Sequence, residues 1–324
     1  MTKPIRILSL DGGGIRGIIP ALLLAELESL TGKPISELFD FIAGTSTGGI
    51  LALGLTKPNE VGKPSYSATE MVQLYEKEGS LIFPQSFWNK LRTFNGVLQE
   101  RYPSAAIESV LKRYFGETRL KDVLVPVLVT SYETERRMAF FFKSRHAVAR
   151  PDYDYFLSDV ARATSAAPTY FEPCKIPVAG EAEYFSLIDG GMFANNPAMC
   201  AYVEAKTMFP DASDFLVVSL GTGQLTKPIY YDKAKHWGLA SWAQPILNVV
   251  FDGVSDTVDY QLSTLLPTKD LLRRYYRFQV TLDPIQEEMD NPTKENLRSL
   301  KLMAEELIRG NKDELQVLAG KLVQ

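Results

Sequence analysis

The segment Gly44-Thr45-Ser46-Thr47-Gly48 is the part of this sequence best suited to chemistry. It follows the apolar run Asp40–Ala43 and precedes a helical stretch, Gly49–Leu55. Glycines two residues to either side of a serine let the chain turn sharply from strand into helix. Such a turn exposes the hydroxyl and leaves backbone N–H groups and a helix N-terminus beside it. The pattern alone is weak, and a tight turn with an idle serine is the alternative, but its context predicts Ser46 as a nucleophile.

A second glycine-rich turn, Asp11-Gly12-Gly13-Gly14-Ile15-Arg16-Gly17, lies between an apolar run and a helical pattern. Glycines there let backbone N–H groups converge on an anion. In isolation the turn also fits a dinucleotide fingerprint, which expects an acidic residue at the end of the second strand. That strand instead runs into Gly44–Gly48, so an oxyanion hole beside a nucleophile fits better. Two roles are open for Arg16, which either stabilises negative charge or pairs with a carboxylate.

The general base has three candidates. The two histidines of the chain, His146 and His236, both lie outside any recognisable catalytic context, and solvent-facing or packing roles suit them better. Asp189-Gly190-Gly191 follows the strand-like run Tyr184–Ile188. A carboxylate at a strand end with glycines after it can approach a serine hydroxyl without obstruction, which favours Asp189 as the base. A simple turn aspartate is the alternative.

In order and spacing, these motifs resemble the patatin-like phospholipase family, most of all the plant storage patatins. The resemblance covers most of the chain and is carried by the three motifs above, with Ala161–Phe171, Phe193–Pro197 and, more weakly, Phe215–Gly223 and Asp259–Leu266. It implies a three-layer α/β/α fold and a Ser46–Asp189 dyad that needs no metal or cofactor. It also implies an oxyanion hole from the backbone of Gly12, Gly13 and Gly14.

By the same resemblance, the expected function is that of a serine lipid acyl hydrolase of the phospholipase A or lysophospholipase type. It would release fatty acids from phospholipids or other glycerolipids through an acyl-enzyme, with transient contact to a membrane surface. Two alternatives stay open: a storage or binding protein with vestigial esterase activity, and an effector that degrades membranes once an activator binds. Head-group preference, sn-position and oligomeric state are not determined by the sequence.

Strand-length apolar runs alternate with helical patterns, which predicts a mainly parallel sheet covered by helices. The helical pattern Ile18–Leu30 is apolar enough to be buried, and Asn196-Pro197 is a helix start, with Asn as N-cap. The strands expected are Ile5–Leu10, Asp40–Gly44, Val123–Thr130, Met138–Lys143, Tyr184–Ile188, Phe215–Leu220 and Arg274–Thr281.

No linker interrupts the chain, so residues 1–324 are expected to form a single domain, with the catalytic motifs in 5–200 and a mainly helical part in 235–324. Between Leu239 and Leu266, apolar residues recur every three or four positions. This spacing predicts a helix that Pro245 starts or kinks and that packs on the sheet. Trp237 and Trp242 near its start are candidates for lipid contact.

The composition excludes several classes of protein. The net charge is −4, from 35 basic and 39 acidic residues, and no basic block is present, which argues against nucleic acid as a partner. No signal peptide and no transmembrane run is recognisable. Cys174 and Cys200 are far apart and in no metal-binding spacing. We therefore expect a cytoplasmic protein, with peripheral attachment to membranes left open.

Overall fold

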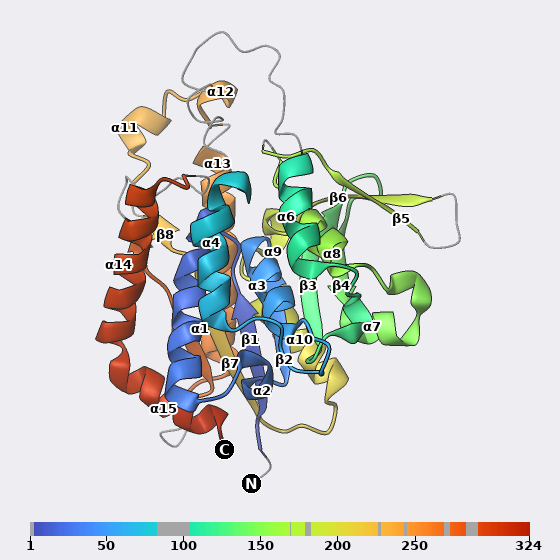
Figure 1. Cartoon of the computed structure of the whole chain (residues 1–324). Helices are drawn as coiled ribbons and strands as arrows, with labels where there is room; N and C mark the ends of the chain where they lie inside the picture. The colour runs from blue at the N-terminus through green and yellow to red at the C-terminus, as the bar shows by residue number, and fades with distance from the viewer. Residues whose placement is uncertain are drawn as a thin grey trace.

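A computed structural model describes residues 3–82, 104–168, 170–178, 183–225, 228–242, 245–268, 273–282 and 291–324. Its centre is a mixed, mainly parallel eight-stranded sheet (Figure 1). The strands of this sheet are β1 (Ile5–Leu10), β2 (Phe41–Thr45), β3 (Val127–Glu133), β4 (Met138–Lys143), β5 (Cys174–Pro177), β6 (Tyr184–Asp189), β7 (Phe215–Leu220) and β9 (Tyr275–Phe278). A separate parallel pair joins β8 (Gln224–Leu225) to β10 (Thr281–Leu282).

Strand β1 lies at the middle of the sheet and pairs in parallel with β2 on one side and β7 on the other. Parallel pairing continues outward from β2 to β3 and from β7 to β9. Beyond β3 the sheet becomes antiparallel, through β4, β6 and β5. The carboxyl ends of the parallel strands therefore share one edge, which is where ligands bind in open α/β sheets.

Helices cover both faces of the sheet and make a three-layer α/β/α sandwich. The described helices are α1 (Ile18–Thr31), α2 (Ile35–Leu38), α3 (Thr47–Thr56), α4 (Ala68–Ile82), α6 (Ala105–Phe115), α7 (Ser144–Ala149), α8 (Leu157–Thr164), α9 (Gly191–Ala194), α10 (Ala198–Met208), α11 (Tyr231–Ala234), α12 (Leu239–Trp242), α13 (Pro245–Leu265), α14 (Lys294–Gly310) and α15 (Lys312–Leu322). The expected fold class is confirmed.

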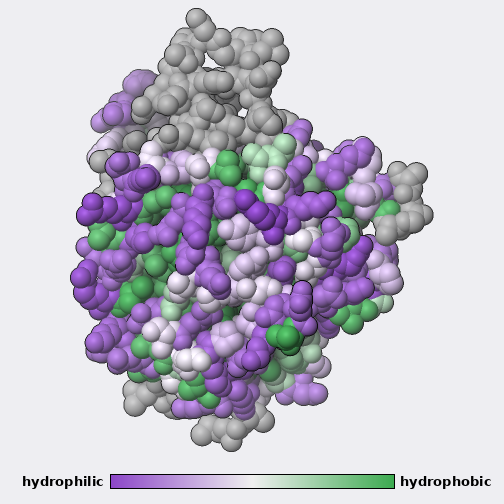
Figure 2. All heavy atoms as spheres, viewed as in Figure 1, coloured by the Kyte–Doolittle hydropathy of each residue, from purple (hydrophilic) through white to green (hydrophobic). Residues whose placement is uncertain are grey.

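The two cores follow the alternation of side chains along β1. Leu8 and Leu10 point into the larger core, which includes residues of α1, α3 and α4, whereas Ile7 points into the smaller core beneath α10 and the end of α13. Successive side chains of a strand face opposite sides of a sheet, so a central strand covered on both faces must be apolar at every position that packs. In Figure 2, on the face over α1, α4 and α14, hydrophobic residues are interspersed among hydrophilic ones.

Several predicted boundaries were wrong. The strand expected from Val123 begins at Val127, because Pro126 has no N–H to offer a neighbouring strand. The strand expected over Arg274–Thr281 is two short strands, β9 and β10, that belong to different sheets. Strand β5 was not predicted; it is short, and its residues alternate between exposed and partly or fully buried at one end of the sheet.

The long helix expected between Leu239 and Leu266 is two helices, and Pro245 begins the second. The packing prediction holds for the end of α13, where Val258 and Leu262 are buried in the smaller core. The expectation of a single domain stays a prediction, which the contacts of α1 with α14 and α15 support. Over the described residues, no helix is both long and apolar enough to cross a membrane.

Candidate active site

Ser46 occupies the one-residue turn between β2 and α3, with backbone angles of φ 54° and ψ −122°. Positive φ is uncommon for a residue with a side chain and persists only where the surroundings enforce it. Two glycines make the turn possible. A Cβ atom on Gly44 would lie 2.2 Å from the carbonyl oxygen of Gly48, and one on Gly48 would lie 2.2 Å from that of Leu10. Both obstacles are backbone, so neither position accepts a side chain.

Strand β3 brings Ser46 and Asp189 together. Thr45, the last residue of β2, pairs with Thr130 of β3, and Asp189, the last residue of β6, pairs with the next residue, Ser131. Strand β4 occupies the other edge of β3 along the same stretch, so β2 and β6 approach each other end to end along a single edge. The nucleophile and the carboxylate are thus placed by consecutive pairs of one strand.

Asp189 is 6% exposed, and its carboxylate accepts the Gly191 N–H at 2.7 Å. The Ser46 hydroxyl lies near enough to this carboxylate to favour its charged form. Burial raises the pKa of Asp189 to about 6, against the lowering effect of Ser46 and Gly191. A Cβ atom on Gly190 would lie 2.1 Å from the Thr130 hydroxyl. Both glycines after Asp189 therefore serve the site: Gly190 lets the turn lie on β3, and Gly191 donates to the carboxylate.

Three threonine hydroxyls hold the turn at Ser46 in place through hydrogen bonds. Thr45 and Thr130 share a hydrogen bond of 2.7 Å, and Thr45 also donates to the carbonyl of Ala194. The Thr164 hydroxyl accepts the N–H of Ser46 at 2.8 Å and donates to the Thr130 carbonyl. The N–H of the nucleophile itself is therefore already bound. Sequence reasoning did not assign Thr164 a role, although it lies in the family-like segment Ala161–Phe171.

The glycine loop approaches Ser46 from the end of β1. A Cβ atom on Gly12 would lie 3.3 Å from the Ser46 Cβ. The Gly12 N–H donates to the carbonyl of Asn195 at 3.0 Å, and the Gly12 carbonyl accepts from the Thr222 hydroxyl at 2.5 Å. Of the three backbone N–H groups expected to bind the oxyanion, that of Gly12 is therefore already bound to a carbonyl. Within the described residues, the N–H groups of Gly13 and Gly14 are the ones left without a partner.

An ion pair holds the start of this loop. Asp11 and Arg277 of β9 are 2.6 Å apart, and both are largely buried. Arg277 also donates to the hydroxyls of Ser219 and Ser255, so one side chain connects β1, β7 and α13. Because the partners of Asp11 lie more than 200 positions away in the chain, no local pattern could have predicted this support.

Arg16 is buried, and its Nε donates to the Gly13 carbonyl at 3.3 Å. Burial raises the pKa of Asp252, and the Arg16 guanidinium opposes that shift, which favours the carboxylate-pairing role over charge stabilisation. Helix α10 begins at Ala198, one position later than expected, so Asn196 lies just before the N-cap residue, and its side chain accepts the N–H of Ala198. Pro197 is the N-cap residue rather than the first helical one.

The two histidines lie outside this cluster. His146 is in α7, whose first residue, Ser144, accepts the N–H of Val127 at the start of β3, three residues before Thr130. His236 is exposed just after α11, and its ring makes no hydrogen bond within the described part of the chain. Neither contacts Ser46 or Asp189 in the structure.

A serine on a strand–helix turn, next to a buried carboxylate and a glycine loop, is the arrangement of a serine acyl hydrolase on an α/β fold. Comparison with known proteins agrees with that class. Residues 8–202 match the family model described as patatin-like phospholipase. The chain belongs to the patatin-like phospholipase family and is a lipid acyl hydrolase.

Its relatives match along nearly the whole chain. Patatin-like protein 4 of Arabidopsis thaliana is 34% identical over 95% of this chain and 84% of its own length. Patatin-like protein 2 of Oryza sativa subsp. indica is 32% identical over 99% of this chain and 88% of its own. Among solved structures, VipD of Legionella pneumophila is similar at 12% identity and a TM-score of 0.44, covering 94% of this chain and 67% of that one.

Proposed function

We propose that this lipid acyl hydrolase is of the phospholipase A or lysophospholipase type and cleaves glycerolipid esters with a Ser46–Asp189 dyad. The observation that carries the proposal is that consecutive residues of β3 place Ser46 and the buried Asp189 carboxylate side by side, next to the glycine loop. A nucleophile, a base in contact with it and unpaired N–H donors nearby are the parts that acyl transfer requires.

In the first half of the reaction, Asp189 accepts the proton of Ser46 as Oγ attacks the ester carbonyl. The N–H groups of Gly13 and Gly14 bind the oxyanion that forms. The tetrahedral intermediate collapses, the bond to the alcohol breaks, and Asp189 returns the proton to the leaving oxygen. The product is an acyl ester on Ser46.

In the second half, a water molecule takes the place of the alcohol. Asp189 removes its proton, the hydroxide attacks the acyl carbonyl, and the same N–H groups bind the second oxyanion. Collapse releases the fatty acid, and the proton on Asp189 returns to Ser46. Asp189 thus gives back each proton that it accepts within the same half-reaction. The dyad therefore turns over without a further acid or base.

The environment of Asp189 explains how a carboxylate can act without histidine. An ordinary carboxylate near pKa 3.8 is a weak base, whereas burial brings Asp189 to about 6, closer to neutral pH. The best catalytic base has a pKa near the working pH, because it is then both ionised and basic. Ser131 and Gly191, on either side, keep the carboxylate fixed through backbone pairing and the 2.7 Å bond.

We also propose transient contact with a membrane surface through the segment before α13. Tyr230 and Tyr231 are 62% and 79% exposed, and the rings of Trp237 and Trp242 pack edge to face 5.2 Å apart. Helices α11 and α12 lie above the edge of the sheet that carries the site (Figure 1). Tyrosine and tryptophan suit a boundary that is apolar on one side and wet on the other.

Turnover tests the proposal. Wild-type protein should hydrolyse a short-chain nitrophenyl ester and release fatty acid from phospholipid vesicles, with the lipid products profiled to give head-group and sn-position preference. Absence of turnover on both substrates would favour the storage or binding alternative. Turnover that appears only after an activator is added would favour the effector alternative. The intact dyad favours direct turnover over both.

A further inference from the structure

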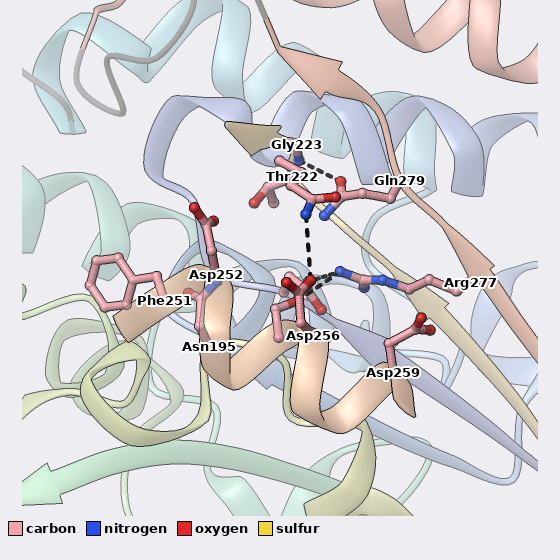
Figure 3. A pocket seen from close by; sticks show the side chains of 12 residues that line it. Asn195, Thr222, Gly223, Phe251, Asp252, Asp256, Asp259, Arg277 and Gln279 are labelled. Carbon is pink, nitrogen blue, oxygen red and sulfur yellow. Dashed lines mark hydrogen bonds and ion pairs between the residues drawn. The ribbon is translucent and has the colours of Figure 1, made fainter. Parts of the chain in front are cut away.

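A polar cavity of about 120 Å³ lies beside the glycine loop, at the carboxyl ends of β1, β7 and β9. Asp252, Asp256 and Asp259 line it from α13. They are spaced four and three residues apart, which places them on one face of that helix. Arg277 and Gln279 line it from the opposite side, as Figure 3 shows.

The cavity is rich in hydrogen-bond acceptors. With Asp11 included, four carboxylates line the cavity, against the guanidinium of Arg277 and that of Arg16 near Asp252, which leaves an excess of two negative charges. The guanidinium of Arg277 already donates to Asp11, Ser219 and Ser255. The Gln279 side-chain oxygen accepts the N–H of Gly223. Asp256 accepts a long 3.5 Å hydrogen bond from Gln224 Nε2, and Asp259 accepts the Tyr275 hydroxyl at 2.9 Å, but both are neutral donors. A ligand would therefore meet mainly negative charge and acceptor oxygens.

Asp11 provides an independent sign of a ligand. Its side chain is almost fully buried, and one carboxylate oxygen, Oδ2, binds Arg277. The other, Oδ1, is also buried and has no hydrogen-bond partner among the described residues. Buried acceptors are rarely left unsatisfied, because the lost solvation is not recovered. A donor placed in the cavity would satisfy this oxygen.

The donor that fits is an ammonium group rather than a metal ion. No group of three or more acidic, histidine or cysteine side chains in the described ranges is arranged to hold a metal ion. An ammonium group needs no such convergence, because its N–H donors can reach separate acceptors. Asp256 and Gln224 are exposed, so the cavity is open to solvent on that side.

The cavity begins one side chain away from the dyad. Asn195 and Phe251 both line it. A Cβ atom on Gly191, which bonds Asp189, would lie 3.2 Å from the Asn195 Oδ1 and 3.6 Å from the Phe251 ring. A lipid whose ester carbonyl lies at Ser46 therefore has its polar end close to this wall.

We propose that the cavity binds the terminal ammonium of an amine-bearing head group, as in an ethanolamine glycerophospholipid. The assignment rests on the proposed function, because it places the head group of the lipid cleaved at Ser46. The phosphate diester, which is negative, stays outside the carboxylate-lined space, since like charges repel. Asp252 and Asp256 are the residues that select the cationic end.

Calorimetric binding of water-soluble head groups tests the site without any need for turnover. Glycerophosphoethanolamine should bind, and glycerophosphoglycerol, which lacks the ammonium, should not. The double variant Asp252→Asn, Asp256→Asn should bind about tenfold more weakly, because two partly solvated charge contacts are lost. The control Asp211→Asn removes an exposed carboxylate between α10 and β7 and should bind as wild type does.

Three results would overturn the assignment: equal binding of the two head groups, unchanged binding by the double variant, or equal affinity for free ethanolamine, which would assign the cavity to free amines. Kinetics separate this inference from the proposed function. The single variant Asp256→Asn, which keeps Asp252 beside Arg16 and the glycine loop, should raise KM on ethanolamine phospholipid micelles and leave both glycerol phospholipid micelles and a nitrophenyl ester unaffected. If wild type hydrolyses none of these, the proposed function fails, and calorimetry still decides the ammonium site.

Discussion

The two glycine-rich turns of the site are built in different ways. The turn at Ser46 is shaped by backbone contacts, since Gly44 lies against the Gly48 carbonyl and Gly48 against the Leu10 carbonyl of β1, at distances that exclude any side chain. The loop at Gly12–Gly14 is held by side chains and carbonyls from far away in the sequence, among them Asn195 and Thr222. The space at the nucleophile turn is thus limited by backbone atoms, whereas the space at the oxyanion loop is limited by side chains that can be changed.

This difference suits their tasks. The nucleophile must present one atom at a fixed point, and a strained, backbone-locked turn does so. The oxyanion donors must match a charge that exists only during the reaction, so their precise placement can be adjusted by supporting residues such as Thr222. Changes in the first turn should therefore destroy the fold or the chemistry outright, whereas changes around the loop should be graded.

The largest effect is expected at the nucleophile. Ser46→Ala should leave the fold intact and lower kcat on the order of a millionfold, as removal of the serine does in other serine hydrolases. Steady-state hydrolysis of a nitrophenyl ester, with circular dichroism as the folding control, checks this. Residual activity within about tenfold of wild type would mean that another residue is the nucleophile.

The next largest effect is expected at the base. Asp189→Asn should lower kcat about 10⁴-fold, since the base is lost while the oxyanion loop remains. The matched control is the double variant His146→Ala, His236→Ala, which should keep nearly full activity because neither histidine contacts the dyad. A folded but inactive double variant would replace the dyad with a triad.

Asp189→Asn should also change how the free energy of unfolding depends on pH. The folded pKa of Asp189, about 6, lies above the ordinary value of 3.8. The folded protein therefore holds this proton more tightly, and the stability it contributes is complete below about pH 4 and lost as the pH rises through 6. Asp189→Asn cannot ionise, so it should be more stable than wild type by about 3 kcal/mol near pH 8, with no gain near pH 4. Equal denaturation curves at both pH values would show that the carboxylate is not destabilised by burial.

The loop should respond in a graded way. Gly13→Ala should lower kcat ~10²–10³-fold with a smaller change in KM, because the donors bind charge that appears only in the transition state. The added methyl would lie 2.2 Å from the Thr222 hydroxyl, so the variant should also lose about 1–3 kcal/mol of stability. Gly310→Ala, where the space around the Cβ is open, is the control.

The two turns can then be compared directly. Replacing Thr222 with glycine should restore part of the stability lost in Gly13→Ala, because the obstacle is a side chain. Gly48→Ala has no such remedy, since its Cβ would meet the backbone of Leu10. A raised KM with unchanged kcat in Gly13→Ala would place the loop in ground-state binding. A well-folded, active Gly48→Ala would end the distinction between the turns.

A smaller effect than those of the substitutions above is expected when kcat/KM of the wild-type protein is measured as a function of pH. Because Asp189 must be ionised to accept the Ser46 proton, kcat/KM should rise with pH and level off above about 6, falling up to tenfold per pH unit below it. A pH–rate profile on a neutral ester checks this. A profile that levels off near pH 4 would mean that the base is an ordinary exposed carboxylate.

The smallest effect is expected at the tryptophan pair. Trp237→Ala with Trp242→Ala should lower activity on phospholipid vesicles several-fold, through lost interfacial contact, and spare activity on a soluble monomeric ester. Equal losses on both substrates would show a packing defect. No loss on either would remove this segment from the lipid path.

The sequence predicted what is local and missed what is not. Ser46 and Asp189 were recognisable because each follows a strand and has glycines at fixed offsets. Their meeting was implied by family resemblance but could not be derived, since it depends on β2 and β6 pairing with consecutive residues of β3. Which glycine N–H groups stay available was likewise hidden, because the Asn195 carbonyl that binds Gly12 carries no side-chain signal.

The fold follows the same rule. The central strand β1 matches its predicted bounds, because a run of buried apolar residues is a strong signal. Failures occur where a strand starts after a proline, as at Val127, or is short and at the end of the sheet, as at Cys174–Pro177. The acidic face of α13 was overlooked because its meaning appears only when Asp11 and Arg277 stand opposite it.

The central claim is that Asp189, and no histidine, activates Ser46. A fluorophosphonate, which modifies activated serines, tests it most directly when the labelled residue is found by peptide mass mapping and the labelling rate is measured. We predict a single adduct on Ser46, formed at the same rate in wild type and in the His146→Ala, His236→Ala variant, and essentially absent in Asp189→Asn. Labelling of another serine, or an unchanged rate in Asp189→Asn, would contradict the account.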